Sequence, residues 1–301
     1  MRLALVINRS AGSFRTLPLD ATIAAITAAL TESGHSVETH LVGRRELAQT
    51  LSAMAGRDEL DAVVVGGGDG TILTAVLAGL GRTKPLGILP LGSLNLFARD
   101  LGLPLDPTQA ARVLSAAQAT RIDLAEVNGL PFAIWASMGM HPWIVRRRDH
   151  LQRDGMRKWR AMVLAALRAF RRYPMVDVTL ELMDGSLAVR TPMLFITNNA
   201  WKDQKPPLSR EALDTGTLVI HVAECRGRLS LLWLVVEAFL GHWLASRRLT
   251  TFTAKEVRVT SHKHRVMVSL DGEVTVLNSP LVFKVRPKAL NVLIPARDRT
   301  L

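Results

Sequence analysis

The stretch Val63-Val64-Val65-Gly66-Gly67-Gly68-Asp69-Gly70-Thr71 decides the fold class of this 301-residue chain. Three consecutive valines are typical of a strand that is buried on both faces of a parallel sheet. The three glycines that follow let the backbone turn sharply and approach a bound group closely. Gly70 and Thr71 then open a helical pattern. Because the first turn of a helix offers unpaired N–H groups, this strand–loop–helix segment predicts a site for an anion such as a phosphate.

Asp69 carries a negative charge inside this loop, so it does not serve to bind phosphate directly. Its position is explained if Mg²⁺ stands between the carboxylate and the phosphates, or if the carboxylate orients a donor group. Thr71 can cap the helix or bind a phosphate. The plainer interpretation is a tight strand–helix turn in which Asp69 is a cap.

Outward from this loop, strands and helices alternate over residues 1–122. Strands are expected at 3–7, 37–42, 61–65 and 86–89, and helices at 21–30, 46–55 and 70–80. This alternation predicts an α/β fold with a doubly wound parallel sheet. A second loop, 90–99, follows the strand at 86–89 and offers Ser93 and Asn95. We expect it beside the first loop at the carboxyl edge of the sheet, as a site or as a capped helix start.

After residue 122 the pattern changes to short strand-like runs, which predict a mainly antiparallel β domain. These runs lie at 131–136, 176–182, 187–197, 217–223, 256–261, 266–270 and 281–285, with helical stretches near 156–172 and 229–245. We therefore predict two domains, 1–124 and 125–301. The prediction includes the option that the last strand of the chain joins the sheet of the first domain.

Composition excludes several classes of protein. Hydrophobic residues make up 48% and charged residues 21%, which is the balance of a folded globular chain and not of a disordered one. Cys225 is the single cysteine, which excludes an intramolecular disulfide and fits a reducing cytoplasm. The first residues hold too short an apolar run for a signal core, so we expect a cytoplasmic protein.

The net charge of +12 is concentrated in the second part of the chain. Residues 1–130 carry a net charge of −1, and residues 131–301 carry +13. A basic surface attracts nucleic acid, anionic lipid or phosphorylated substrates. Aromatic residues are only 5% of the chain, so few rings can stack on bases, and no nucleic-acid-binding signature is present. We therefore expect no nucleic-acid partner.

Two helical stretches suggest contact with a membrane. Residues 143–173 contain ten Lys and Arg, and within 156–172 apolar residues such as Trp159 and Phe170 recur at helical spacing. This basic helix 156–172 is suited to an anionic bilayer surface, or it packs on the β domain with a solvated basic face. The stretch 229–245 is too short and too charged for a membrane span; it is a buried helix, or it lies on a bilayer surface.

Four segments, in this order, resemble the diacylglycerol kinase catalytic domain family, which also includes sphingosine kinases and soluble bacterial lipid kinases. Asn8-Arg9-Ser10-Ala11-Gly12 is similar to the family's first nucleotide loop, Asn-Pro-x-x-Gly. Gly67-Gly68-Asp69-Gly70-Thr71, the loop with Gly92-Ser93-Leu94-Asn95, and Asp271-Gly272-Glu273 complete the match. Their order and spacing agree across nearly the whole chain.

The resemblance implies an ATP-dependent lipid kinase, with ATP and Mg²⁺ as cofactors. Such a kinase would transfer the γ-phosphoryl group to a primary hydroxyl of a membrane lipid that is diacylglycerol-like, phosphatidylglycerol-like or sphingoid. Glu273 would be the general base, and Asp69 and Asp123 would organise Mg²⁺. The active site would lie in the interdomain cleft of a protein peripheral to the inner membrane surface. The nucleotide would contact Asn8, Arg9, Ser10, Ala11, Gly12, Gly66, Gly67, Gly68, Asp69, Gly70, Thr71, Ser93 and Asn95.

The chain departs from the family pattern at three places. Arg9 replaces proline and Ser93 replaces threonine, which keeps the hydroxyl. In the turn with Asp214, Thr215 and Thr217, threonine replaces the second acid of a structural Mg²⁺ site. One carboxylate holds a hard cation poorly, so we do not expect a metal there.

Two other functions stay open. An NAD kinase shares the Gly-Gly-Asp-Gly-Thr loop, but the Gly92–Asn95 loop and the late Asp-Gly-Glu disfavour it. A catalytically silent regulator that binds nucleotide or lipid is disfavoured because Asp69, Asp123 and Glu273 are all retained.

Overall fold

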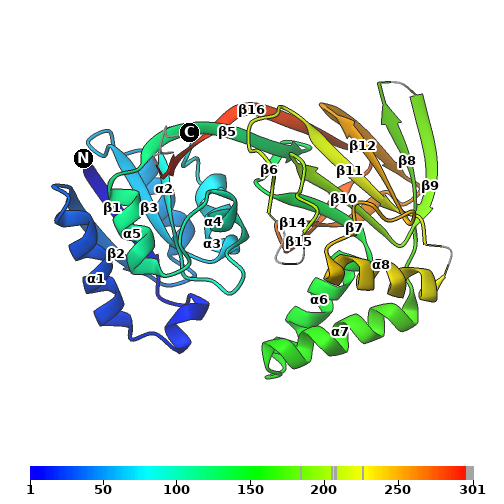
Figure 1. Cartoon of the computed structure of the whole chain (residues 1–301), viewed down its shortest axis with the longest axis horizontal. Coiled ribbons are helices and arrows are strands. Elements are labelled where there is room, and N and C mark those ends of the chain that lie inside the picture. Colours follow the sequence, from blue (N-terminus) through cyan, green and yellow to red (C-terminus); the bar gives the residue numbers. More distant parts are fainter. Residues whose placement is uncertain (184, 205, 207–208, 226, 296–301) are drawn as a thin grey trace. The chain divides into compact units, whose positions relative to one another are not determined.

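The computed structural model describes residues 1–295 except 184, 205, 207, 208 and 226. The chain divides into two compact units (Figure 1). Unit 1 consists of Met1–Leu124 and the segment from Pro287 onward, and unit 2 is Ala125–Arg286. The expected second domain ran to residue 301, and its residues 296–301 lie outside the described part. Strand β5 (Gln118–Val127) and strand β16 (Leu281–Ile294) each contribute residues to both units.

Unit 1 is built on a parallel sheet in the order β2-β1-β3-β4-β16. Its strands are β1 (Arg2–Asn8), β2 (Ser36–Val42), β3 (Ala62–Gly67), β4 (Leu86–Pro90) and the end of β16, where Val292 pairs with Leu86. Every residue of β3 and β4 is buried, as expected for strands covered on both faces. The predicted doubly wound parallel sheet is thereby confirmed.

The helices of unit 1 divide between the two faces of this sheet. They are α1 (Leu19–Thr31), α2 (Leu47–Ala55), α3 (Asp69–Leu77), α4 (Leu96–Asp100) and α5 (Pro107–Ser115). The chain moves one way from β1 to β2 and the other way from β2 through β3 to β4, so right-handed crossovers place α1 on one face and α2 and α3 on the other. The packing agrees, since α1 contacts α5 and α2 contacts α3.

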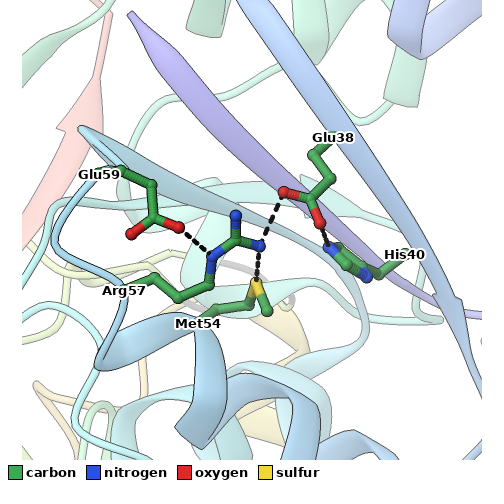
Figure 2. A network of polar contacts seen from close by, with 5 residues as sticks. All are labelled: Glu38, His40, Met54, Arg57 and Glu59. Carbon is green, nitrogen blue, oxygen red and sulfur yellow. Dashed lines mark hydrogen bonds and ion pairs between the residues drawn. The ribbon is translucent and has the colours of Figure 1, made fainter.

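A surface network holds the connection after α2 against the edge strand β2 (Figure 2). The Arg57 guanidinium donates to Glu38 and to Glu59, both at 2.7 Å, and His40 contacts Glu38 at 2.8 Å. The hydrogen bond from Arg57 lowers the pKa of Glu59. Because the two glutamates are exposed and Arg57 and His40 are only partly buried, the network orders this edge without adding much stability.

Unit 2 contains two antiparallel sheets. One has the order β12-β11-β10-β7-β14-β15, and in the other the start of β16 continues to β13, β8 and β9, with β5 pairing β16 and β6. The strands are β6 (Leu130–Phe132), β7 (Trp135–Gly139), β8 (Val176–Leu182), β9 (Gly185–Thr191), β10 (Met193–Asn198), β11 (Leu218–Ala223), β12 (Leu249–Ala254), β13 (Glu256–Ser261), β14 (Arg265–Leu270) and β15 (Glu273–Asn278).

Both sheets contribute to one apolar core. Phe132 of β6 and Phe283 of β16 meet edge to face, with ring centroids 6.3 Å apart, and side chains of β7, β10, β11 and β14 belong to the same cluster. The predicted antiparallel domain is therefore confirmed.

Three helices lie together in unit 2: α6 (Met140–Arg153), α7 (Lys158–Arg172) and α8 (Arg228–Leu240). Figure 1 shows all three on the same side of the strands. They share a small core that includes Met140, Ala169, Leu231 and Leu234. Arg228 of α8 donates to the carbonyl of Arg171 at 2.6 Å, which joins the start of α8 to the end of α7.

Several expected elements of unit 2 need correction. The run 187–197 is two strands because Pro192, which has no N–H to donate, separates β9 from β10. The run 131–136 is likewise split between β6 and β7, and 281–285 is the start of the longer β16. Helix α6 and strands β12 and β15 were not predicted. The run Arg146-Arg147-Arg148 interrupts the apolar periodicity of α6, which conceals the helix.

The expectation of a buried helix at 229–245 is wrong. Helix α8 ends at Leu240, where Gly241 takes a left-handed conformation (φ 85°). Of its residues, only Leu231 and Leu234 are buried, because α8 packs on the rest of unit 2 along one narrow stripe. Among the described residues, no helix is both long and apolar enough to cross a membrane.

Candidate active site

The three loops predicted to hold nucleotide meet at one edge of the unit 1 sheet. Ile7 pairs with Gly66 and Gly67 with Pro90, so β1, β3 and β4 end level with one another. The connections after β1 and β3 leave toward opposite faces of the sheet. Such a reversal of strand order opens a crevice at the carboxyl ends of the strands, which is where ligands bind in open α/β sheets.

Side-chain hydrogen bonds join the first loop to the glycine loop. Asn8 Nδ2 donates to Thr71 Oγ1 at 3.0 Å, and Asn8 Oδ1 accepts the N–H of Ser10 at 3.0 Å. Both Asn8 and Thr71 are buried. Asn8 therefore shapes the loop, and the exposed members Arg9, Ser10 and Gly12 remain on its outer side.

The glycines allow the loops to pack more closely than any side chain would permit. A Cβ at Gly67 would lie 2.4 Å from the side chain of Thr71, and a Cβ at Gly92 would lie 2.4 Å from Cα of Gly68. The N–H of Leu91 also donates to the carbonyl of Gly67 at 3.0 Å. The glycine loop and the 90–99 loop are thus in backbone contact, as predicted.

Asn95 closes the second loop on itself. Its Oδ1 accepts the N–H of Gly92 at 2.8 Å, and its Nδ2 donates to the carbonyl of Gly92 at 3.0 Å. Asn95 takes a left-handed conformation (φ 50°), which asparagine tolerates better than most residues, and it precedes α4. Ser93 is exposed at the tip of this loop.

Asp69 faces the start of α4. Its Oδ1 accepts the N–H of Phe97 at 3.2 Å. Burial raises the pKa of Asp69, although the backbone donors at Phe97 and Leu96 act in the opposite direction. A cation beside Asp69 would favour the ionised carboxylate and so oppose this effect of burial.

Asp123 lies on β5 and is buried, and its Oδ1 accepts the N–H of Lys288 of β16 at 2.9 Å. This bond ties β5 to β16 within unit 1. No group of three or more His, Cys, Asp or Glu side chains that could hold a metal ion occurs in the part of the chain that the structure describes.

The Asp271-Gly272 pair forms the turn between β14 and β15, and Glu273 is the first residue of β15. Both turn residues have positive φ (47° and 89°), which is the geometry of a type I′ hairpin. The buried Asp271 carboxylate accepts the N–H groups of Ala133, Ile134 and Trp135 at 2.7–2.9 Å. Glu273, in contrast, is exposed. The turn therefore fixes the backbone while the glutamate side chain stays accessible.

Thr215 and its neighbours form a hydrogen-bond cluster in unit 2. Thr215 donates its N–H to Asn199 Oδ1 at 3.1 Å, its hydroxyl also contacts that oxygen, and it lies 2.7 Å from the hydroxyl of Thr217. This is the turn in which the family pattern has a second acid and this chain has Thr215. Here the side chains of Thr215, Thr217 and Asn199 bind one another.

Family models match nearly all of the chain. Residues 2–127 match the diacylglycerol kinase catalytic domain, and residues 136–294 match the YegS C-terminal NAD kinase beta sandwich-like domain. The chain belongs to the diacylglycerol kinase catalytic domain family. The resemblance inferred from the four motifs is confirmed, and the chain is assigned to the lipid kinases.

Individual proteins are similar to most of the chain. A diacylglycerol kinase of Mycobacterium tuberculosis is 28% identical over 304 residues, which cover 93% of this chain and 94% of the relative. An uncharacterized Synechocystis protein is 24% identical over 78% of this chain, which spans 55% of that protein. The crystal structure of a diacylglycerol kinase from Bacillus anthracis is 17% identical, covers 99% of this chain and 98% of that one, and has a TM-score of 0.71, which shows a common fold.

Unit 2 of this lipid kinase also contains an aromatic cluster that the sequence analysis missed. Trp201 stacks on His221, with ring centroids 5.8 Å apart and planes 8° from parallel, and Trp243 contacts both rings. Trp135, His141 and Phe195 extend the cluster. The members are far apart in sequence and come from different elements, so no local pattern identified them.

Burial of His221 in this cluster makes the stability of the kinase sensitive to acid. Burial lowers the pKa of His221 to about 4, so the folded state keeps it neutral while the unfolded state binds a proton below about pH 6.5. Its contribution to stability is complete above pH 6.5 and is lost as pH falls toward 4. Over this range, we expect the free energy of unfolding of the wild type to fall by about 3 kcal/mol more than that of His221→Asn. Asparagine is chosen because it can keep the hydrogen bond with Thr251.

Urea unfolding between pH 4 and 7.5 measures this difference. Asp271, whose pKa burial raises to about 6, contributes the opposite slope in both proteins and cancels in the comparison. His264→Gln, at an exposed position, is the control and is expected to follow the wild type. Parallel curves for the wild type and His221→Asn would show that His221 has no such role.

Proposed function

We propose that this protein is an ATP- and Mg²⁺-dependent lipid kinase that transfers the γ-phosphoryl group to a primary hydroxyl of a membrane lipid. The observation that carries the proposal is the close packing of the glycine loops at the sheet edge, in which Gly67 and Gly92 leave no room for a Cβ and a Cβ at Gly68 would lie 3.1 Å from Cα of Gly92. Loops packed in this way present backbone N–H groups and the start of α3 toward a phosphate. The acceptor lipid is diacylglycerol-like, phosphatidylglycerol-like or sphingoid.

The residues of unit 1 fit a nucleotide with its metal. Ser10 and Ser93 offer hydroxyls at the loop tips, and Arg9 offers a guanidinium. Thr71 Oγ1 accepts a bond from Asn8, so its own O–H hydrogen can be donated to a phosphate. Magnesium is commonly held by one or two carboxylates together with phosphates, and Asp69 and Asp123 are the carboxylates proposed for it. When bound, it would neutralise charge that develops on the phosphates.

Glu273 is the proposed general base. Its carboxylate takes the proton of the lipid hydroxyl as the hydroxyl oxygen forms a bond to the γ-phosphorus and the bond to the ADP oxygen breaks. The reaction therefore requires the carboxylate of Glu273 to lie beside the acceptor hydroxyl.

Transfer of label from [γ-³²P]ATP tests the function. The full chain is incubated with phosphatidylcholine vesicles that contain diacylglycerol, phosphatidylglycerol or a sphingoid base, and in a separate arm with soluble NAD. Label in a lipid supports the proposal and names the acceptor, and label in NAD supports the NAD kinase alternative. Nucleotide binding without transfer to any of these acceptors supports the silent regulator.

We further propose that helices α7 and α8 dock on an anionic membrane surface. The small residues Ala161, Ala165 and Ala169 are the buried side of α7, whereas Trp159 is 77% exposed. On α8, Trp233 and Phe239 are 58% and 68% exposed. Helix α7 also carries Arg160, Arg168, Arg171 and Arg172, and α8 begins with Arg228, which bonds to the end of α7. Exposed apolar side chains next to basic residues are the combination that binds an anionic bilayer interface.

Replacing the exposed rings is expected to weaken this binding. In Trp159→Ser/Trp233→Ser/Phe239→Ser, the transfer of each ring into the bilayer, worth about 2 kcal/mol, is lost. Flotation with phosphatidylcholine–phosphatidylglycerol vesicles should therefore show more than about a tenfold lower bound fraction. Met183→Ser/Leu187→Ser is the control, because these exposed side chains lie on the β8–β9 hairpin. Equal flotation of the triple variant and the wild type would contradict the docking surface.

A further inference from the structure

A basic groove lies between α6 and α7 within unit 2. It has a volume of about 590 Å³. Its lining includes five arginines, one histidine and one tryptophan: Trp143, Arg146, Arg147, His150, Arg153, Arg168 and Arg172. We call this set the arginine groove.

The positive charge of the arginine groove is not neutralised within the described residues. Of the two acids of this segment, Asp149 pairs at 2.7 Å with Arg148, which does not line the groove. Asp154 contacts the groove histidine, His150, at 3.3 Å and pairs with none of the five arginines. None of the five groove arginines makes an ion pair with a described residue. Like charges gathered in one groove repel each other, so an anion in the groove would relieve this repulsion.

The guanidinium of Arg168 has a donor to which such an anion could bind. Its Nη1 is buried and has no hydrogen-bond partner among the residues that the structure describes. A buried guanidinium N–H without an acceptor carries a desolvation cost that one charged acceptor would remove. The planar guanidinium matches the oxygens of a phosphate, which can accept two parallel hydrogen bonds from it.

We propose that the arginine groove binds a phosphate group, carried by a lipid headgroup or by a soluble phosphate compound. The lipid source is favoured by a second groove along α7, which is lined by Trp159, Val163 and Leu167 and is mostly apolar. Acyl chains near this second groove would bring a headgroup phosphate within reach of the arginines on α6 and α7. This binding needs no nucleotide and is independent of the proposed kinase reaction.

Two double variants, one on each helix, test the groove. Arg168→Gln/Arg172→Gln changes α7, and Arg146→Gln/Arg147→Gln changes α6. The matched control Arg190→Gln/Arg258→Gln removes the same charge from strands β9 and β13. Circular dichroism and thermal unfolding verify that each variant is folded, and all binding is measured without ATP.

Two arms distinguish the source of the phosphate. In the first, vesicles of phosphatidylcholine with or without phosphatidic acid are used; in the second, inorganic phosphate and glycerol 3-phosphate are titrated calorimetrically. We expect both groove variants to bind phosphatidic acid vesicles at least tenfold more weakly than the wild type, and the control less than twofold. Binding in the soluble arm that the groove variants lose would identify a free phosphate compound as a ligand. An equal loss in the groove variants and the control, or no loss in either groove variant in either arm, would overturn the proposal.

Discussion

Exchange of Glu273 for glutamine is expected to lower phosphoryl transfer from ATP to lipid by about 10²–10⁴-fold, the usual contribution of a general base. Glutamine keeps the size and polarity of the side chain but cannot take the hydroxyl proton. Glu273 is exposed at the start of β15, and the turn before it is held by Asp271 and not by Glu273. The fold should therefore be unaffected, and the loss should be in kcat with little change in KM for ATP.

The measurement is the initial rate of lipid phosphorylation at saturating ATP as a function of pH. Glu256→Gln is a matched control, since Glu256 is an exposed glutamate of the same unit that pairs with Lys284. It should retain wild-type activity. If Glu273→Gln keeps more than half of the wild-type rate, Glu273 is not the base.

Substitution of alanine for Gly92 is expected to lower ATP affinity at least tenfold and to destabilise unit 1 by about 1–3 kcal/mol, as overpacking does. The added Cβ would lie 2.4 Å from Cα of Gly68 and 2.7 Å from Oδ1 of Asn95. Backbone atoms cannot rotate away as a flexible side chain can. The 90–99 loop must therefore move away from the glycine loop, which separates the groups proposed to hold the phosphates.

Calorimetric titration with ATP and Mg²⁺, together with urea unfolding, measures both effects. Gly56→Ala is the control, because Gly56 ends α2 with a negative φ and the nearest atom to an added Cβ is 3.7 Å away. Unchanged ATP affinity in Gly92→Ala, with the expected loss of stability, would show that the loops pack together without binding nucleotide.

The candidate site was predictable from sequence to the extent that its signals are local. The glycine loop follows a run of valines, and the second loop follows the next strand, so the meeting of the two loops follows from the parallel sheet. The hydrogen bonds that hold these loops and turns in place were not predictable. Asn8 bonds to Thr71, 63 residues away, and Asp271 holds backbone groups near residue 134. Such pairs form only when folding brings distant elements together.

The buried and exposed sides of the helices were also not predictable from local sequence. The sequence by itself determined the alternating strands and helices up to β4, the two-part composition of the chain and the loops at the sheet edge, because strand, turn and helix preferences act over a few residues. Only the tertiary structure decided which side of each helix is buried. Helix α7 packs through its alanines and exposes Trp159, and α8 exposes Trp233 and Phe239. Hydrophobicity favours burial but does not specify a partner, so the packing of neighbouring elements determines which apolar residues stay at the surface.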